Sequence, residues 1–80
     1  MYILLKKVDA ANNVNRWYAV FIQATLFDKI AVITAWGSLE TSYQQTRSEP
    51  ADTKELALRR ADEIIQSKIK RGYQIVEQNI

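Results

Sequence analysis

The chain of 80 residues contains no cysteine and no histidine, and it has only two glycines and one proline. Without cysteine there is no disulfide and no thiolate metal site. Without histidine, the commonest metal ligand and the commonest general base are both missing. Because Gly37 and Gly72 are the only glycines, the chain contains neither a GxxxxGK nor a GxGxxG phosphate-binding loop. We therefore expect a non-enzymatic protein that holds no metal and no small-molecule cofactor.

Long apolar runs are also missing. No stretch approaches the roughly 20 apolar residues that span a bilayer. The short apolar run at the N-terminus is followed, not preceded, by its lysines, which is unlike a secretory signal peptide. The formal net charge of +2 is mildly basic and below that of a dedicated polyanion binder. These features predict one domain over residues 1–80, cytoplasmic and without membrane contact.

What the chain does have is a series of segments with strand composition, rich in aromatic and β-branched residues. The segment 16–25 is apolar on both alternating faces, which is typical of a central strand. We expect Asp28 and Lys29 to form a hairpin tip, Gly37 to end a strand and Pro50 to close one. The expected strands are 2–8, 16–25, 30–36 and 43–49, with 73–76 as a fifth.

One long helix is predicted over residues 52–71. Asp52 can cap its first turn, with Glu55 three residues later as in a capping box. Gly72 occupies the position of a C-terminal cap. At 100° per residue one arc collects the apolar side chains of this helix. That arc contains Ala57, Leu58, Ala61, Ile64, Ile65 and Ile69. Strands and helix together predict an α+β fold, with four or five antiparallel strands and one helix across one face.

Two features leave alternatives open. Lys68 lies within the apolar arc, so its stem either covers the core and sends the amine to water or directs the amine at an anion. Trp36 lies on a strand, where a tryptophan is either part of the core or a platform for a ligand. The basic residues near the helix end, which include Lys70 and Arg71, form either a solvated surface or a patch for phosphates.

Seven short motifs, in order, resemble the WGR domain, the module of DNA-dependent poly(ADP-ribose) polymerases and of many bacterial proteins. The likeness runs from about Leu5 to Val76 and is closest to the short bacterial stand-alone members. The tripeptide Trp36-Gly37-Ser38 falls on the name motif. The other matches are Arg16-Trp17-Tyr18, Leu26-Phe27-Asp28, Gln44, Ala57, Lys68 and Lys70-Arg71-Gly72-Tyr73.

The resemblance implies a curved antiparallel sheet crossed by one C-terminal helix, and a role in binding DNA or other nucleic acid. It implies that Trp36 packs against the sugar–phosphate at a DNA break, and we expect Trp36 to stack on a sugar or a base. This likeness and the basic residues together predict the nucleic-acid-binding residues Trp36, Gly37, Ser38, Gln44, Arg47, Lys68, Lys70 and Arg71.

The chain departs from the family in the segment that follows Trp36. Ser38 replaces the arginine of the name motif, and Glu40 and Tyr43 replace two glycines. A lost charge-assisted contact removes about 1.5–3 kcal/mol of binding free energy. The alternative function is therefore a protein-interaction module that has lost DNA binding and that pairs with a partner through the strand 43–49.

Overall fold

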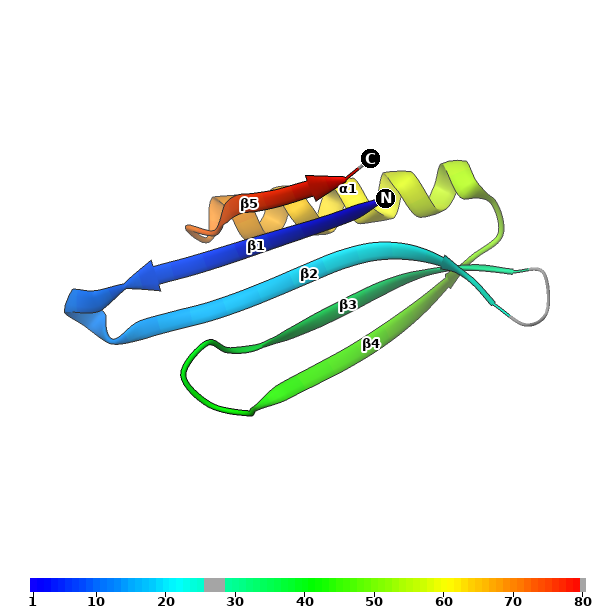
Figure 1. Cartoon of the computed structure of the whole chain (residues 1–80). Coiled ribbons are helices and arrows are strands. Elements are labelled where there is room, and N and C mark those ends of the chain that lie inside the picture. Colours follow the sequence, from blue (N-terminus) through cyan, green and yellow to red (C-terminus); the bar gives the residue numbers. More distant parts are fainter. Residues whose placement is uncertain (26–28, 80) are drawn as a thin grey trace.

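The computed structural model describes residues 1–25 and 29–79, which form one five-stranded antiparallel sheet and one long helix (Figure 1). The strands lie in the order β4-β3-β2-β1-β5. Their bounds are β1 Tyr2–Asp9, β2 Val14–Ala24, β3 Ile30–Ser38, β4 Gln44–Ala51 and β5 Gln74–Asn79. A 3-10 turn, Ala10–Asn12, joins β1 to β2, and α1, Lys54–Lys70, joins β4 to β5. The predicted α+β class is confirmed.

The central strand is β2, as its two apolar faces predict. It pairs with β1 on one side and β3 on the other, through Leu5↔Tyr18 and Tyr18↔Trp36 for example. The turn before β2 is closed by Asp9, whose carboxylate accepts hydrogen bonds from Asn12. The predicted hairpin tip at Asp28 lies outside the described residues.

The core lies between one face of the sheet and α1. Leu5, Val20 and Val32 from adjacent strands are fully buried there. They meet a narrow stripe of the helix, Ala57, Ala61 and Ile65, where the small alanines let the backbone approach the sheet. Our wider apolar arc was wrong at its border, because Leu58 and Ile69 remain 40% and 39% exposed.

The helix begins one residue later than the capping pattern predicts. Thr53 is the N-cap, and its hydroxyl accepts a hydrogen bond from the backbone N–H of Leu56 at 3.1 Å. Asp52 is therefore not the cap, and Glu55 takes no part in a capping box. The helix ends at Lys70, and Gly72 follows its C-cap in the predicted terminating position, with a φ of +96°. The backbone N–H of Tyr73 donates to the carbonyl of Lys68, which completes a Schellman motif.

Two expected strand ends lie inside strands. Gly37 does not end β3, since it pairs with Trp17 on β2 and Gln44 on β4. A glycine is needed here because the backbone at Tyr43 lies so close to Gly37 that a Cβ would collide with the carbonyl oxygen of Tyr43. Pro50 lies within β4, where it is tolerated because β4 is an edge strand.

The helix is shorter than the sheet it covers. Seventeen residues of α1 span about 26 Å at ~1.5 Å each, whereas the eleven residues of β2 span about 36 Å at ~3.3 Å each. The joined ends of β1 and β2, and of β3 and β4, therefore extend past the C-terminus of α1 (Figure 1). Within the described part of the chain, no helix is long and apolar enough to cross a membrane.

Candidate nucleic-acid interface

A groove of about 980 Å³ lies where the sheet extends past the end of α1. We call it the cationic groove. It is lined by four basic side chains, Lys7, Arg16, Lys68 and Arg71. The remaining lining residues are Trp17, Tyr18, Trp36, Gly37, Ser38, Tyr43 and Tyr73. None of the described residues that line the groove is acidic, so its surface is mainly basic and aromatic.

The four basic residues of the groove come together through strand register and through the helix end. Lys7 on β1 lies directly opposite Arg16 on β2, and Arg16 lies opposite Ser38 on β3. Like charges directly opposite one another destabilise a sheet. Among the described residues, none of the four has a carboxylate within ion-pair distance. An anion in the groove would relieve this repulsion.

The aromatic side chains form a continuous surface beside these charges. Tyr18 and Trp36 lie stacked, with ring centroids 5.8 Å apart and planes 13° apart. The ring of Tyr73 meets Tyr18 edge-on at 6.2 Å. Trp36 is half-buried, so it both packs against Tyr18 and contributes to the groove. Such a surface suits a sugar or a base of a nucleic acid, whose faces stack on aromatic rings.

Lys68 combines the two alternatives that the sequence left open, because its stem covers the core while its amine lies over aromatic rings inside the groove. Its stem is half-buried against the sheet, and its Nζ lies 4.4 Å from the centre of the Tyr18 ring and 5.9 Å from that of Tyr73. Burial and, to a smaller degree, the nearby charge of Arg71 lower the pKa of its amine below 10.5. A phosphate bound nearby would favour the charged amine and reverse this shift.

We expect the Lys68→Met variant to be slightly more stable than the wild type at pH 7, with a higher melting temperature, because the partly buried amine carries its charge at a cost. The lowered pKa means that the unfolded chain binds more protons than the fold between the two pKa values, so wild-type stability rises with pH there. The difference should vanish as the pH approaches 10.5. Thermal unfolding of both proteins across this range is the measurement, and a difference that grows with pH would contradict the assignment.

The structure brings five of the eight predicted site residues together: Trp36, Gly37, Ser38, Lys68 and Arg71. Gln44 and Lys70 are exposed but do not line the groove. Sequence reasoning missed Lys7, Arg16, Tyr18 and Tyr73 as site residues. The cross-strand register that brings Lys7 beside Arg16 was the missing information.

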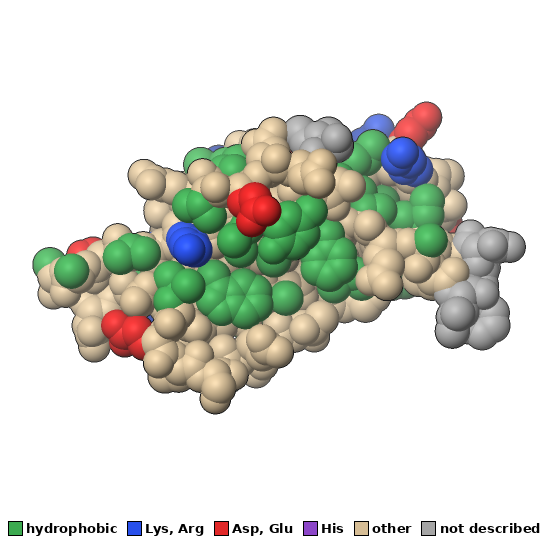
Figure 2. Space-filling view, viewed as in Figure 1, with side chains coloured by type: hydrophobic (Ala, Val, Ile, Leu, Met, Phe, Trp, Pro, Cys, Tyr) green, Lys and Arg blue, Asp and Glu red, His purple; other side chains and the backbone are tan. Residues whose placement is uncertain are grey.

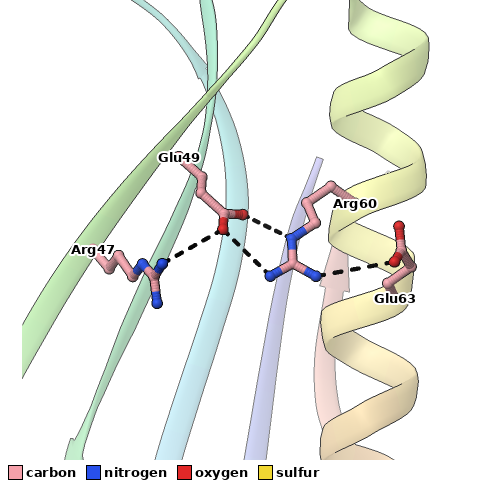
Figure 3. Close-up of polar contacts among 4 residues, drawn as sticks. All are labelled: Arg47, Glu49, Arg60 and Glu63. Carbon is pink, nitrogen blue, oxygen red and sulfur yellow. Dashed lines mark hydrogen bonds and ion pairs between the residues drawn. The ribbon is translucent and has the colours of Figure 1, made fainter.

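Arg47 lies away from the groove, in a separate network between β4 and α1 (Figure 3). Glu49 accepts a hydrogen bond from Nε of Arg60 at 2.8 Å and lies 3.8 Å from Arg47. The hydrogen bond with Arg60 holds the pKa of the Glu49 carboxyl below its usual value. The bond between Arg60 and Glu49 ties α1 to the edge strand β4. Because Glu49 also partly neutralises Arg47, this network adds no free positive charge to the cationic groove.

The turn after Trp36 is held by its own polar side chains. The hydroxyl of Ser38 accepts a hydrogen bond from the backbone N–H of Glu40 at 3.1 Å. The carboxylate of Glu40 accepts one from the side-chain amide of Asn15 at 3.3 Å. Glu40 therefore points its charge at Asn15, and it is not among the residues that line the groove.

Two remaining findings bear on this site, namely the lack of a metal cluster in the part of the chain that the structure describes and one match to a known family. Across the described residues, no group of three or more acidic side chains could hold a metal ion. No curated protein and no solved structure matches the chain significantly. The family model of the WGR domain matches residues 1–80, the whole chain. This protein therefore belongs to the WGR domain family.

Proposed function

We propose that the cationic groove binds nucleic acid, weakly and without sequence preference. The single observation that carries this proposal is the collection of four basic residues, without a carboxylate partner in the described chain, around the stacked pair Tyr18 and Trp36. The basic side chains would contact phosphates, and the aromatic surface would take a sugar or a base. The association of WGR domains with nucleic-acid binding supports the proposal.

The presence of Ser38 where the WGR motif has an arginine does not leave this part of the groove without positive charge. Arg16 lies directly opposite Ser38 on the neighbouring strand and lines the same groove. Lys7 follows on the next strand. The groove thus retains a row of two basic residues beside position 38, and Arg71 lines the same groove from the helix end. We therefore propose that the groove binds phosphates although the arginine of the WGR motif is missing.

Fluorescence anisotropy with end-labelled DNA, measured over a range of salt concentrations, tests the proposal. With two to four phosphate contacts, the logarithm of the affinity should fall against the logarithm of the salt concentration with a slope of about −2 to −3.5. Binding that is absent at low salt, or that does not change with salt, would refute it.

The Trp36→Ala variant separates stacking from charge. Loss of the aromatic face should weaken binding by about 1–3 kcal/mol, roughly 5- to 150-fold, with the salt slope unchanged. The Trp36→Phe variant keeps a ring and should restore much of the affinity. An unchanged affinity in the alanine variant would place the nucleic acid elsewhere.

A further inference from the structure

The face of the sheet opposite α1 carries a second surface, which the cationic groove does not explain. We call it the open face. Figure 2 shows it as a cluster of hydrophobic side chains over the middle of the sheet, with one basic and one acidic side chain at its border. Strand alternation places Tyr2, Leu4, Phe21 and Ile33 there, with Tyr2 and Phe21 in contact at 6.1 Å between ring centroids. No described element covers it.

The open face is built in rows of contrasting size. One row across the strands, read from the register, contains the large side chains Tyr2, Phe21 and Ile33. The next row contains Leu4, Ala19 and Ala35, so it has two alanines where its neighbour has Phe21 and Ile33. The first row forms a ridge and the second a furrow. A surface with a ridge beside a furrow can fit a copy of itself.

A two-fold rotation places the ridge of one copy over the furrow of the other. The axis lies in the plane of the interface, at right angles to the strands and between the two rows. Phe21 of one copy then lies over Ala19 of the other, Ile33 over Ala35, and Tyr2 over Leu4. Because the axis also passes through the middle of the face, the outer rows, which contain Gln23 and Trp17, cover one another as well. Sheets stacked face to face in this way lie about 10 Å apart.

The charges of the open face favour a copy over a charged partner. Within the strands, its charged residues are Lys6 on β1 and Glu77 on β5, both at the same side of the apolar rows. Their charges cancel, so the face attracts neither a nucleic acid nor an acidic protein. In the two-fold arrangement Glu77 lies over Asn79 of the other copy, and no like charges meet among the described residues. A polar border around an apolar centre is the usual composition of a protein interface.

We infer that the open face pairs with the open face of a second copy, so that the protein forms a symmetric dimer with its two sheets stacked. Closed two-fold dimers are the commonest soluble assemblies, and their interfaces are self-complementary in this way. The helices then lie on the outside, and the basic residues of the cationic groove, which lie on the helix side of the sheet or at the helix end, stay accessible in each copy.

Light scattering after size-exclusion chromatography tests the inference. The wild type should have twice the monomer mass of 9.2 kDa at micromolar concentration. The Ile33→Glu variant, which buries a charge in the interface, should have the monomer mass. A matched control, Leu58→Glu, alters an exposed apolar side chain on α1 and should remain a dimer. A wild type that stays monomeric at hundreds of micromolar would overturn the inference.

A cross-linking experiment avoids any doubt about the folding of the Ile33 variant. Because the chain has no cysteine, single cysteines can be placed at will. Ser48→Cys lies at the border of the open face on β4, where the two copies approach, and a short bis-maleimide should link it. Gln45→Cys is exposed on the other face of the same strand and should not be linked. Equal linking of both variants, or of neither, would contradict the stacked arrangement.

Discussion

The Arg16→Glu variant should bind DNA about 100-fold more weakly than the wild type, or worse, at low salt. The substitution removes one of the four basic residues of the groove and places a carboxylate among the other three. A hydrogen bond between charged groups contributes about 1.5–3 kcal/mol, and repulsion of a phosphate adds to the loss. The salt slope should fall by about one unit, since one phosphate contact is lost.

The same variant should be at least as stable as the wild type, which sets it apart from a folding defect. The introduced carboxylate would lie directly opposite Lys7, and an opposite-charge pair at such positions contributes about 0.2–1 kcal/mol. Arg59→Glu is the matched control, because Arg59 is exposed on α1, lies outside the groove and changes the net charge equally. If both variants lose affinity equally, the overall charge governs binding and the groove does not.

The Gly37→Ala variant should lose about 2–4 kcal/mol of its free energy of unfolding, a large part of the stability of a domain of this size. A Cβ at Gly37 would overlap the carbonyl oxygen of Tyr43 and come within 3.0 Å of the indole nitrogen of Trp17. The oxygen belongs to the backbone, so β4 must move to make room. Urea unfolding measures the loss, and the melting temperature should fall by about 10 °C or more.

The Gly72→Ala variant provides the comparison, because an alanine there strains the backbone conformation, whereas an alanine at position 37 collides with neighbouring atoms. Its φ of +96° is strained for an alanine, yet its nearest neighbours are atoms of the flexible Lys7 side chain at 3.4 Å and beyond. We expect a cost of about 1–2 kcal/mol there. If Gly37→Ala costs no more than Gly72→Ala, the close approach of β3 and the start of β4 does not require the glycine.

The strands and the helix could be predicted because their signals are local. The aromatic and β-branched run of β2 predicts a strand with two apolar faces, and β2 lies at the centre of the sheet. The helix stops just before Gly72, a glycine whose positive φ the local backbone requires whatever surrounds it. The start of the helix was misplaced, because Asp52 and Thr53 are both good caps and only the backbone geometry at Thr53 decides between them.

The groove could be predicted only in part. Trp36, Lys68 and Arg71 were identified through motifs, which are read along the chain. Arg47 was predicted together with them, but it does not line the groove, and its partner Glu49 is two residues away on the same face of β4. Charge alone does not reveal whether a basic side chain is already neutralised.

The sequence by itself determined the strands, the helix, the α+β class and the order of motifs that the WGR family shares. The tertiary structure alone decided which basic residues share a groove and why Gly37 is a glycine. Lys7 and Arg16 are nine residues apart, and antiparallel register brings them opposite one another. A strand pairing of this kind joins distant residues through backbone hydrogen bonds, so neither composition nor spacing along the chain records it.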